Sequence, residues 1–134
     1  MEKMPVQRPV QAEGLPKPVG PYSPAVVFDR LVFVSGQGAI DPATGVLAGL
    51  DIESQTEQVF DNLEAILKAA GTDLRRVIRC GVFLVDMRDF GPMNAVYARR
   101  FGDHRPARTT VAVSSLPHAG LRVEMDAVAS LPGE

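Results

Sequence analysis

The residues Ala25-Val26-Val27-Phe28-Asp29-Arg30-Leu31-Val32-Phe33-Val34-Ser35 decide the fold class of this chain. Two runs rich in β-branched and aromatic residues flank the polar pair Asp29-Arg30, and this arrangement predicts a β-hairpin. In the second run, apolar side chains occupy both faces of the predicted strand. A strand from a sheet with helices on one face only should alternate apolar and polar residues. The apolar side chains on both faces of this sheet must therefore be buried by other parts of the structure.

Two helices are predicted downstream of the hairpin. Residues 53–70 form the first, because apolar side chains recur there at the 3.6-residue spacing of an amphipathic helix. Gly71 follows as a C-terminal stop. Asp89 is expected to cap the second helix, with Pro92 in its first turn. Both helices are expected to pack on the same side of the sheet.

Three further strands, at residues 77–85, 108–113 and 122–131, complete the order ββαβαββ, an α+β layer on a mixed sheet. The chain has 134 residues, without an internal repeat or a long linker. Residues 1–134 are therefore expected to form a single domain. The proline-rich residues 1–19 are expected to be extended and partly frayed at their start.

The chain has no residues left to cover the second apolar face of strands 31–34 and 82–85. A partner subunit is the economical cover, so we expect an oligomer. By strand alternation, Arg108 and Thr110 share one face, and Glu124 lies on the polar face of the last strand. If the apolar sets face the helices, all three side chains point toward the subunit contact.

Composition narrows the function classes. The formal net charge is −2, with 14 basic and 16 acidic residues, which argues against extended binding to nucleic acid. No apolar run is long enough to span a membrane, and the N-terminus lacks the apolar segment of a signal peptide. Cys80 is the only cysteine, which fits a reducing cytoplasm, and we expect it to be a buried strand thiol.

Arg108 is the residue that points most directly to function. It follows Pro106-Ala107 at the start of a predicted strand that otherwise has a core pattern. A guanidinium in such a place needs a partner, and its planar fork suits a carboxylate or phosphate held by two hydrogen bonds. From the residues alone, a structural ion pair with Glu124 and a site for a small acidic ligand both stay open.

The chain resembles the RidA/YjgF family of enamine/imine deaminases from about Gly20 to about Ala129. The resemblance rests on an ordered set of segments: Gly20-Pro21-Tyr22-Ser23-Pro24-Ala25, Ser35-Gly36-Gln37, Asp41-Pro42 with Thr44-Gly45, Gln58…Asn62-Leu63, Ala69-Ala70-Gly71, Val82-Phe83-Leu84 with Asp86, Asn94…Tyr97, Pro106-Ala107-Arg108 and Val123-Glu124. It implies a chorismate-mutase-like fold and a homotrimer whose sheets form a central barrel. Three equivalent clefts would lie between the subunits.

The resemblance also implies roles for single residues. Arg108 matches the arginine that grips the substrate carboxylate, and Glu124 matches the acidic residue near the bound water or imine. The remaining matches lie at the wall of the cleft: Tyr22, Ser35, Gly36 and Asn94. Thr110 stands where many members have cysteine, so a hydroxyl replaces a thiol there. The segment 101–106 is shorter than in some members, which bears on substrate size.

The implied reaction is hydrolysis of 2-imino acids, tautomers of enamines such as 2-aminoacrylate, to 2-keto acids and ammonia. It needs no cofactor and no metal, because the imine carbon is already electrophilic. His104 and His118 are expected to be ordinary loop histidines, since no acidic cluster accompanies them. Tyr22, Ser35 and Asn94 could equally serve packing or a turn.

Three other functions compete with this interpretation. A trimer that binds 2-keto acids without turnover would need the same arginine anchor. A deaminase for a larger aminoenoate would exploit the altered segment before Pro106. Endoribonuclease activity, a label often attached to the family, is disfavoured because the chain lacks a basic face and its two histidines fit no acid–base pair.

Overall fold

The predicted hairpin forms the start of a six-stranded sheet. In the computed structural model, which describes residues 4–133, β2 (Ala25–Phe28) pairs antiparallel with β3 (Leu31–Gly38). Ala25 lies opposite Val34, and the turn is made at Asp29, whose φ of 56° is left-handed. Aspartate tolerates this conformation better than most residues, because its short side chain can bond the backbone locally. The turn and both strands are confirmed.

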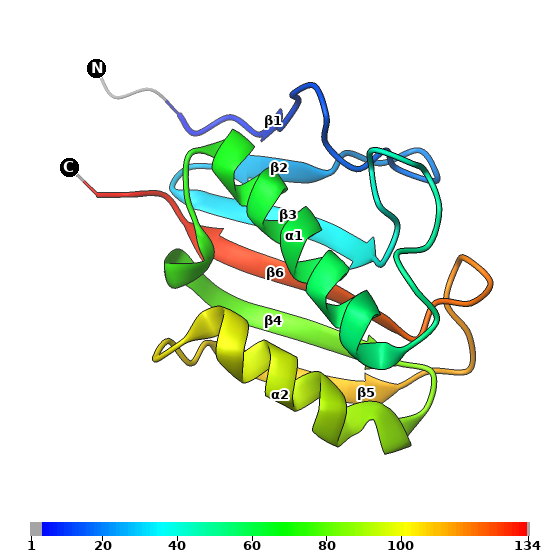
Figure 1. Cartoon of the computed structure of the whole chain (residues 1–134). Helices are drawn as coiled ribbons and strands as arrows, with labels where there is room; N and C mark the ends of the chain where they lie inside the picture. Colours follow the sequence, from blue (N-terminus) through cyan, green and yellow to red (C-terminus); the bar gives the residue numbers. More distant parts are fainter. Residues whose placement is uncertain (1–3, 134) are drawn as a thin grey trace.

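The complete sheet has the order β1-β2-β3-β6-β4-β5 (Figure 1). β4 (Val77–Leu84) pairs parallel with β5 (Ala107–Ala112), and the other neighbours are antiparallel, including β6 (Val123–Ser130). The N-terminal segment contributes a short strand that the sequence did not predict, β1 (Arg8–Pro9), paired with β2. The expected frayed start falls on residues 1–3, outside the described residues.

Both helices lie on the same face of the sheet, as predicted (Figure 1). α1 (Ile52–Ala70) begins at Asp51, whose carboxylate accepts the N–H of Ser54 at 2.8 Å. It ends at Gly71, whose φ of 93° lets its N–H reach the Lys68 carbonyl at 3.0 Å. A 3₁₀ turn, η1 (Leu74–Arg76), leads into β4. These caps satisfy backbone groups that a helix end otherwise leaves unpaired.

The predicted cap of α2 (Phe90–Phe101) is wrong in its detail. Asp89 occupies the N-cap position, but its side chain makes no capping hydrogen bond. The 3₁₀ turn η2 (Met87–Asp89) precedes the helix, so the Asp89 backbone is already helical (φ −81°, ψ −3°). Asp86 caps η2 instead, and the Asp89 carboxylate is free to pair with Arg122. Local sequence patterns did not predict this extra turn.

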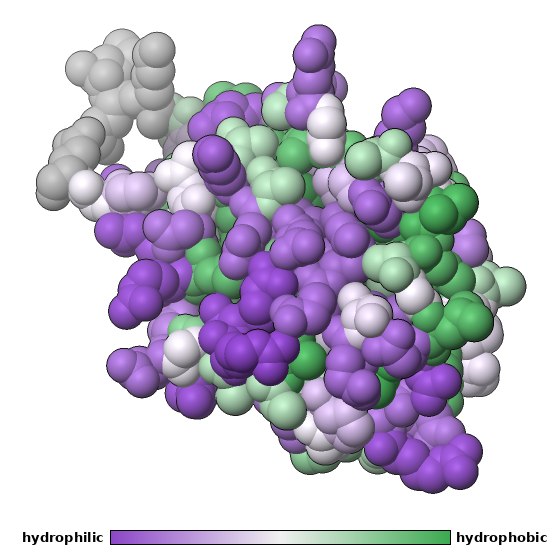
Figure 2. Space-filling view, in the orientation of Figure 1, coloured by the Kyte–Doolittle hydropathy of each residue, from purple (hydrophilic) through white to green (hydrophobic). Residues whose placement is uncertain are grey.

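The core lies between the sheet and the helices. Phe60 of α1 is fully buried and meets two rings of α2 edge-on, Tyr97 at 5.7 Å and Phe101 at 5.3 Å between ring centroids. Arg100 covers this cluster from outside and pairs with Glu57 at 2.9 Å and Asp61 at 2.8 Å. Figure 2 accordingly shows hydrophilic residues over the outer side of the helices. The ring contacts and the ion pairs together join the two helices.

The opposite face of the sheet carries no helix and leaves several large apolar side chains exposed. Phe28 is 44% exposed, Phe33 45% and Val111 39%, and Phe28 and Phe33 each follow a buried valine in their strands. Isolated exposed apolar residues are ordinary, but several on one uncovered sheet face are typical of an interaction surface. The prediction that one chain leaves the second face uncovered is therefore confirmed. Among residues 4–133, no helix is both long and apolar enough to cross a membrane.

We expect Phe60→Ala to lower the free energy of unfolding by about 3–5 kcal/mol, since it removes a buried ring that both helices contact. Urea unfolding at one fixed protein concentration measures the change. Leu50→Ala, at a side chain 76% exposed, is the matched control and should stay within about 0.5 kcal/mol. Equal effects of the two substitutions would contradict this account of the core.

Candidate functional site

The residues predicted to form the site fall into two groups in the structure. Tyr22, Gly36 and Glu124 line one hollow of about 70 Å³, named here the Glu124 hollow. Asn94 and Arg108 line a second, the Arg108 hollow, between α2 and the start of β5. Ser35 lies in β3 with Gly36, and Thr110 lies in β5 with Arg108, but neither residue lines either hollow. A single chain therefore holds two partial sites.

Glu124 lies across the backbone of Gly36. β3 and β6 are in register up to Val34 and again from Gln37, so Gly36 falls within a β-bulge. A Cβ at position 36 would overlap the Glu124 carboxylate where it now lies, so a larger residue there would displace that carboxylate. Glu124 is half-buried, and desolvation, reinforced by the negative charge of Asp126, raises its pKa. The bulge thus places a carboxyl group with a tendency to keep its proton beside the hollow.

Tyr22 and Ser35 have structural bonds of their own. The Tyr22 hydroxyl accepts the N–H of Val19 at 3.2 Å, so the ring closes its own loop while lining the hollow. The Ser35 hydroxyl donates to the carbonyl of Ser23 at 2.7 Å. That bond ties β3 to the loop before β2, and it favours a packing role for Ser35 over direct contact with a ligand.

Arg108 lies against two aromatic rings of α2. Its guanidinium carbon is 4.7 Å from the centre of the Tyr97 ring and 5.6 Å from that of Phe90. Stacking of this kind holds the planar fork in a fixed orientation and leaves its donor edge available. Within residues 4–133, Arg108 forms no ion pair. The structural Arg108–Glu124 ion pair that the sequence left open is therefore absent from this part of the chain.

Two buried polar atoms beside Arg108 lack a hydrogen-bond partner in the described part of the chain. They are the Asn94 Oδ1 and the Tyr97 hydroxyl, both from residues that line the Arg108 hollow. Unsatisfied buried polar groups are rare, because each costs about 1–3 kcal/mol. Their position beside an unpaired guanidinium is what a site for a polar ligand requires.

The prediction that Arg108, Thr110 and Glu124 share one face is wrong. Arg108 and Thr110 lie beside the buried Cys80 and Val82 of β4, on the helix face. Glu124 points to the open face. Alternation sorts a strand into two sets but does not say which set faces the core. In the edge strand β5, the polar set is the one beneath α2.

The two hollows are also separated laterally. β4 lies between β5, which carries Arg108, and β6, which carries Glu124. Adjacent strands are about 4.8 Å apart, so the backbones of these two residues are separated by roughly 10 Å and their side chains leave opposite faces. One chain does not bring the predicted anchor and the predicted acid together.

Sequence reasoning missed the aromatic support of Arg108. Phe90 and Tyr97 were not considered as site residues, although they stand four residues before and three after Asn94. That spacing puts all three on one face of a helix. The signal was present in the sequence, but its meaning depends on Arg108 lying under this face of α2.

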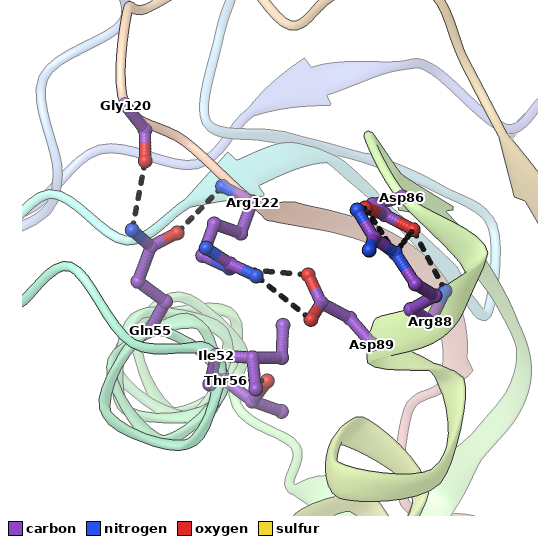
Figure 3. A network of polar contacts seen from close by, with 8 residues as sticks. All are labelled: Ile52, Gln55, Thr56, Asp86, Arg88, Asp89, Gly120 and Arg122. Atoms are coloured by element: carbon purple, nitrogen blue, oxygen red, sulfur yellow. Dashed lines mark hydrogen bonds and ion pairs between the residues drawn. The ribbon is translucent and has the colours of Figure 1, made fainter.

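A polar network fixes the segment that leads to Glu124 (Figure 3). The fully buried Gln55 donates to the carbonyls of Gly49 at 3.0 Å and Gly120 at 2.9 Å, and it accepts the Arg122 N–H at 2.7 Å. The Arg122 guanidinium binds the buried Asp89 with two hydrogen bonds of 2.9 and 3.1 Å. The network therefore joins α1, the start of α2 and the start of β6.

The two histidines and the cysteine have structural surroundings rather than places in either hollow's chemistry. The His104 ring bonds the Val77 carbonyl at 2.6 Å, and the His118 ring bonds the carbonyl of Ala119 at 2.7 Å. In the part of the chain that is described, no group of three His, Cys, Asp or Glu side chains is placed to hold a metal ion. Cys80 is buried, as predicted, and desolvation raises its pKa to about 11.

Comparison with known proteins identifies the family to which this chain is similar. The sequence model described as Endoribonuclease L-PSP matches residues 13–131. A RutC family protein of Pyrococcus horikoshii is 50% identical over 117 residues, which cover 87% of this chain and 92% of that protein. A mouse protein named 2-iminobutanoate/2-iminopropanoate deaminase is 40% identical over 124 residues, 92% of this chain and 91% of its own.

A solved structure agrees with these sequence matches. Escherichia coli TdcF with bound serine superposes with a TM-score of 0.87 at 32% identity, covering 93% of this chain and 99% of that one. The chain therefore belongs to the RidA/YjgF family. The predicted fold class is confirmed with it.

Because its pKa is raised to about 11, Cys80 should be almost entirely protonated at pH 8 and should react slowly with a thiolate-selective reagent such as DTNB. We expect little labelling of the native protein and one thiol per chain after unfolding in guanidinium, as the sequence contains a single cysteine. Rapid native labelling at pH 8 would contradict the burial of Cys80.

Proposed function

We propose that this protein hydrolyses 2-imino acids, the tautomers of enamines such as 2-aminoacrylate, to 2-keto acids and ammonia. The Arg108 hollow of one copy would meet the Glu124 hollow of the next to form each cleft. Family membership supports the reaction class, since relatives that share 40% of the sequence bear the name 2-iminobutanoate/2-iminopropanoate deaminase. Serine bound to TdcF supports a small amino-acid-like ligand.

The observation that carries the proposal is the set of contacts around the Arg108 guanidinium. Its fork is stacked on two rings, lies at a hollow, and has no acidic partner within residues 4–133. A small carboxylate would supply two charge-assisted hydrogen bonds to such a fork. Asn94 Oδ1 is an acceptor, so it would receive a hydrogen bond from the imine or enamine N–H of the same ligand.

The reaction requires few catalytic groups from the protein. Water adds to the carbon of the protonated imine and loses a proton, which gives a carbinolamine. Its amino group takes up a proton and leaves as ammonia, and loss of the hydroxyl proton forms the carbonyl of the 2-keto acid. No cofactor or metal enters these steps. Orientation by Arg108 and a positioned acid or base at Glu124 would supply the acceleration, the latter about 10²–10⁴-fold. The Thr110 and Tyr22 hydroxyls are available to orient water at the cleft wall.

Two features support a cleft built from two copies. The sheet face that carries Glu124 is uncovered in one chain and leaves several large apolar side chains exposed. In a cyclic oligomer, different surfaces of neighbouring copies meet at every contact, so complementary hollows can pair around the ring. We infer a homotrimer, the assembly that the family resemblance implies. The Glu124 hollow of one chain has a volume of about 70 Å³ and would be completed by the neighbouring copy.

A coupled assay tests the reaction. A PLP-dependent threonine dehydratase generates 2-iminobutanoate in the presence of semicarbazide, which traps the imine. We expect the wild-type protein to suppress semicarbazone formation, Arg108→Ala to lose this effect, and Glu124→Gln to retain about 1% or less of the activity. Arg76→Ala, at an exposed arginine of η1 away from both hollows, is the matched control and should keep wild-type activity.

An active Arg108→Ala protein in its native assembly would contradict the mechanism. If the wild type binds 2-oxobutanoate but turns nothing over, the non-catalytic carboxylate-binding trimer takes the place of the deaminase. Turnover of bulky imines in preference to 2-iminobutanoate would favour the larger aminoenoate. RNA cleavage that follows the assembly through purification and survives Arg108→Ala would favour a nuclease.

Mixing the two inactive variants tests the shared cleft. Sedimentation should first show an oligomer at micromolar concentration. If Arg108→Ala and Glu124→Gln are co-expressed, some contacts then join an intact Arg108 to an intact Glu124, and activity should return to about a quarter of the wild-type level when the copies mix at random. Activity that stays at the level of the separate variants would show that each site lies within one chain.

A further inference from the structure

A second carboxylate shares the open face with Glu124. Asp126 stands two residues further along β6, so both side chains leave the strand on the side away from the helices. Each lies across a glycine of a neighbouring strand, Glu124 across Gly36 of β3 and Asp126 across Gly81 of β4. A Cβ at Gly81 would stand 2.5 Å from Asp126 Oδ1. The two glycines let both carboxylates lie flat against the sheet.

The two carboxylates differ in their hydrogen bonds. Asp126 Oδ1 accepts the backbone N–H of Gly81 at 2.8 Å, which holds this carboxylate against β4. Glu124 receives no hydrogen bond from residues 4–133 and is half-buried. Desolvation, and after it the negative charge of the neighbouring Asp126, raises the pKa of Glu124.

We propose that Asp126 is a positioning residue whose fixed negative charge keeps a proton on Glu124, so that Glu124 serves as the proton donor of the site. The inference rests on the proposed function and assigns the direction of proton transfer within it. Departure of ammonia from the hydrated imine needs a proton on nitrogen, and a protonated Glu124 can give one. The Glu124 carboxylate formed in that step can then take the hydroxyl proton of the same intermediate as the keto carbonyl forms.

Other charged groups near Glu124 do not cancel the influence of the Asp126 charge on the Glu124 proton. Lys17, His118 and Tyr22 line the Glu124 hollow, but neither Lys17 nor His118 forms an ion pair with Glu124 in the described structure. Arg79 shares a surface hollow with Asp126, yet its guanidinium donates to the Thr109 hydroxyl at 3.3 Å.

A neighbouring copy adds one more charge. In the proposed cleft, its Arg108 approaches Glu124, and a bound substrate carboxylate neutralises that guanidinium. With substrate in place, Asp126 is therefore the charge that most affects Glu124. This is also why the acidity of Glu124 has to be measured in the native assembly with a carboxylate bound.

The test is a titration of the Glu124 carboxyl by ¹³C NMR in the native assembly, with and without saturating 2-oxobutanoate. The signal is assigned by its loss in Glu124→Gln. Asp126→Asn removes the charge and keeps an oxygen that accepts the Gly81 N–H. We expect this variant to titrate Glu124 at lower pH than the wild type does. Asp103→Asn removes the same charge from an exposed turn and should leave the midpoint unchanged.

Activity supplies a second, separate readout. A proton donor loses activity as the pH rises through its pKa, so Asp126→Asn should move the alkaline limb of kcat to lower pH. An unchanged Glu124 midpoint in Asp126→Asn overturns the inference even if imines are hydrolysed. If the Glu124 titration midpoint falls in Asp126→Asn but the wild type hydrolyses no imine, the influence of the Asp126 charge on Glu124 is supported. The role of Glu124 as proton donor is then overturned together with the proposed function.

Discussion

The sheet has large apolar side chains on both faces, and the chain supplies helices for only one of them. α1 and α2 bury one face around Phe60, while Phe33 and Val111 remain in solvent on the other. Apolar burial is the main favourable term in folding, so such a face favours association. The rest of the structure follows from this imbalance, because Glu124 lies on the uncovered face and Arg108 lies under α2.

The division of the site has a physical benefit. An arginine and a glutamate placed in one pocket of one chain would pair with each other and block a carboxylate ligand. Here Arg108 is held by aromatic stacking, which fixes its plane but satisfies none of its donors. Glu124 is held over a glycine that leaves its carboxyl unbonded. Each half is thus pre-organised and unsatisfied, the condition that favours a ligand between them.

The Gln55–Arg122–Asp89 network explains how the halves keep their geometry. Asp89 begins the helix that supports Arg108, and Arg122 precedes the strand that carries Glu124. A movement of either element would break hydrogen bonds to buried groups, which is costly. Local rules did not predict this, because Asp89 has the sequence context of a helix cap, and only the 3₁₀ turn before it releases its carboxylate for Arg122.

The sequence by itself determined the order of strands and helices from β2 onward, the turns at Asp29 and Gly71, and the burial of Cys80. These depend on the periodicity and backbone preferences of adjacent residues, which local rules describe. Only the tertiary structure decided which face of β5 carries Arg108, which rings support it, and that Glu124 lies over Gly36. These depend on contacts between segments far apart in the chain, and strand alternation is equally satisfied by either orientation.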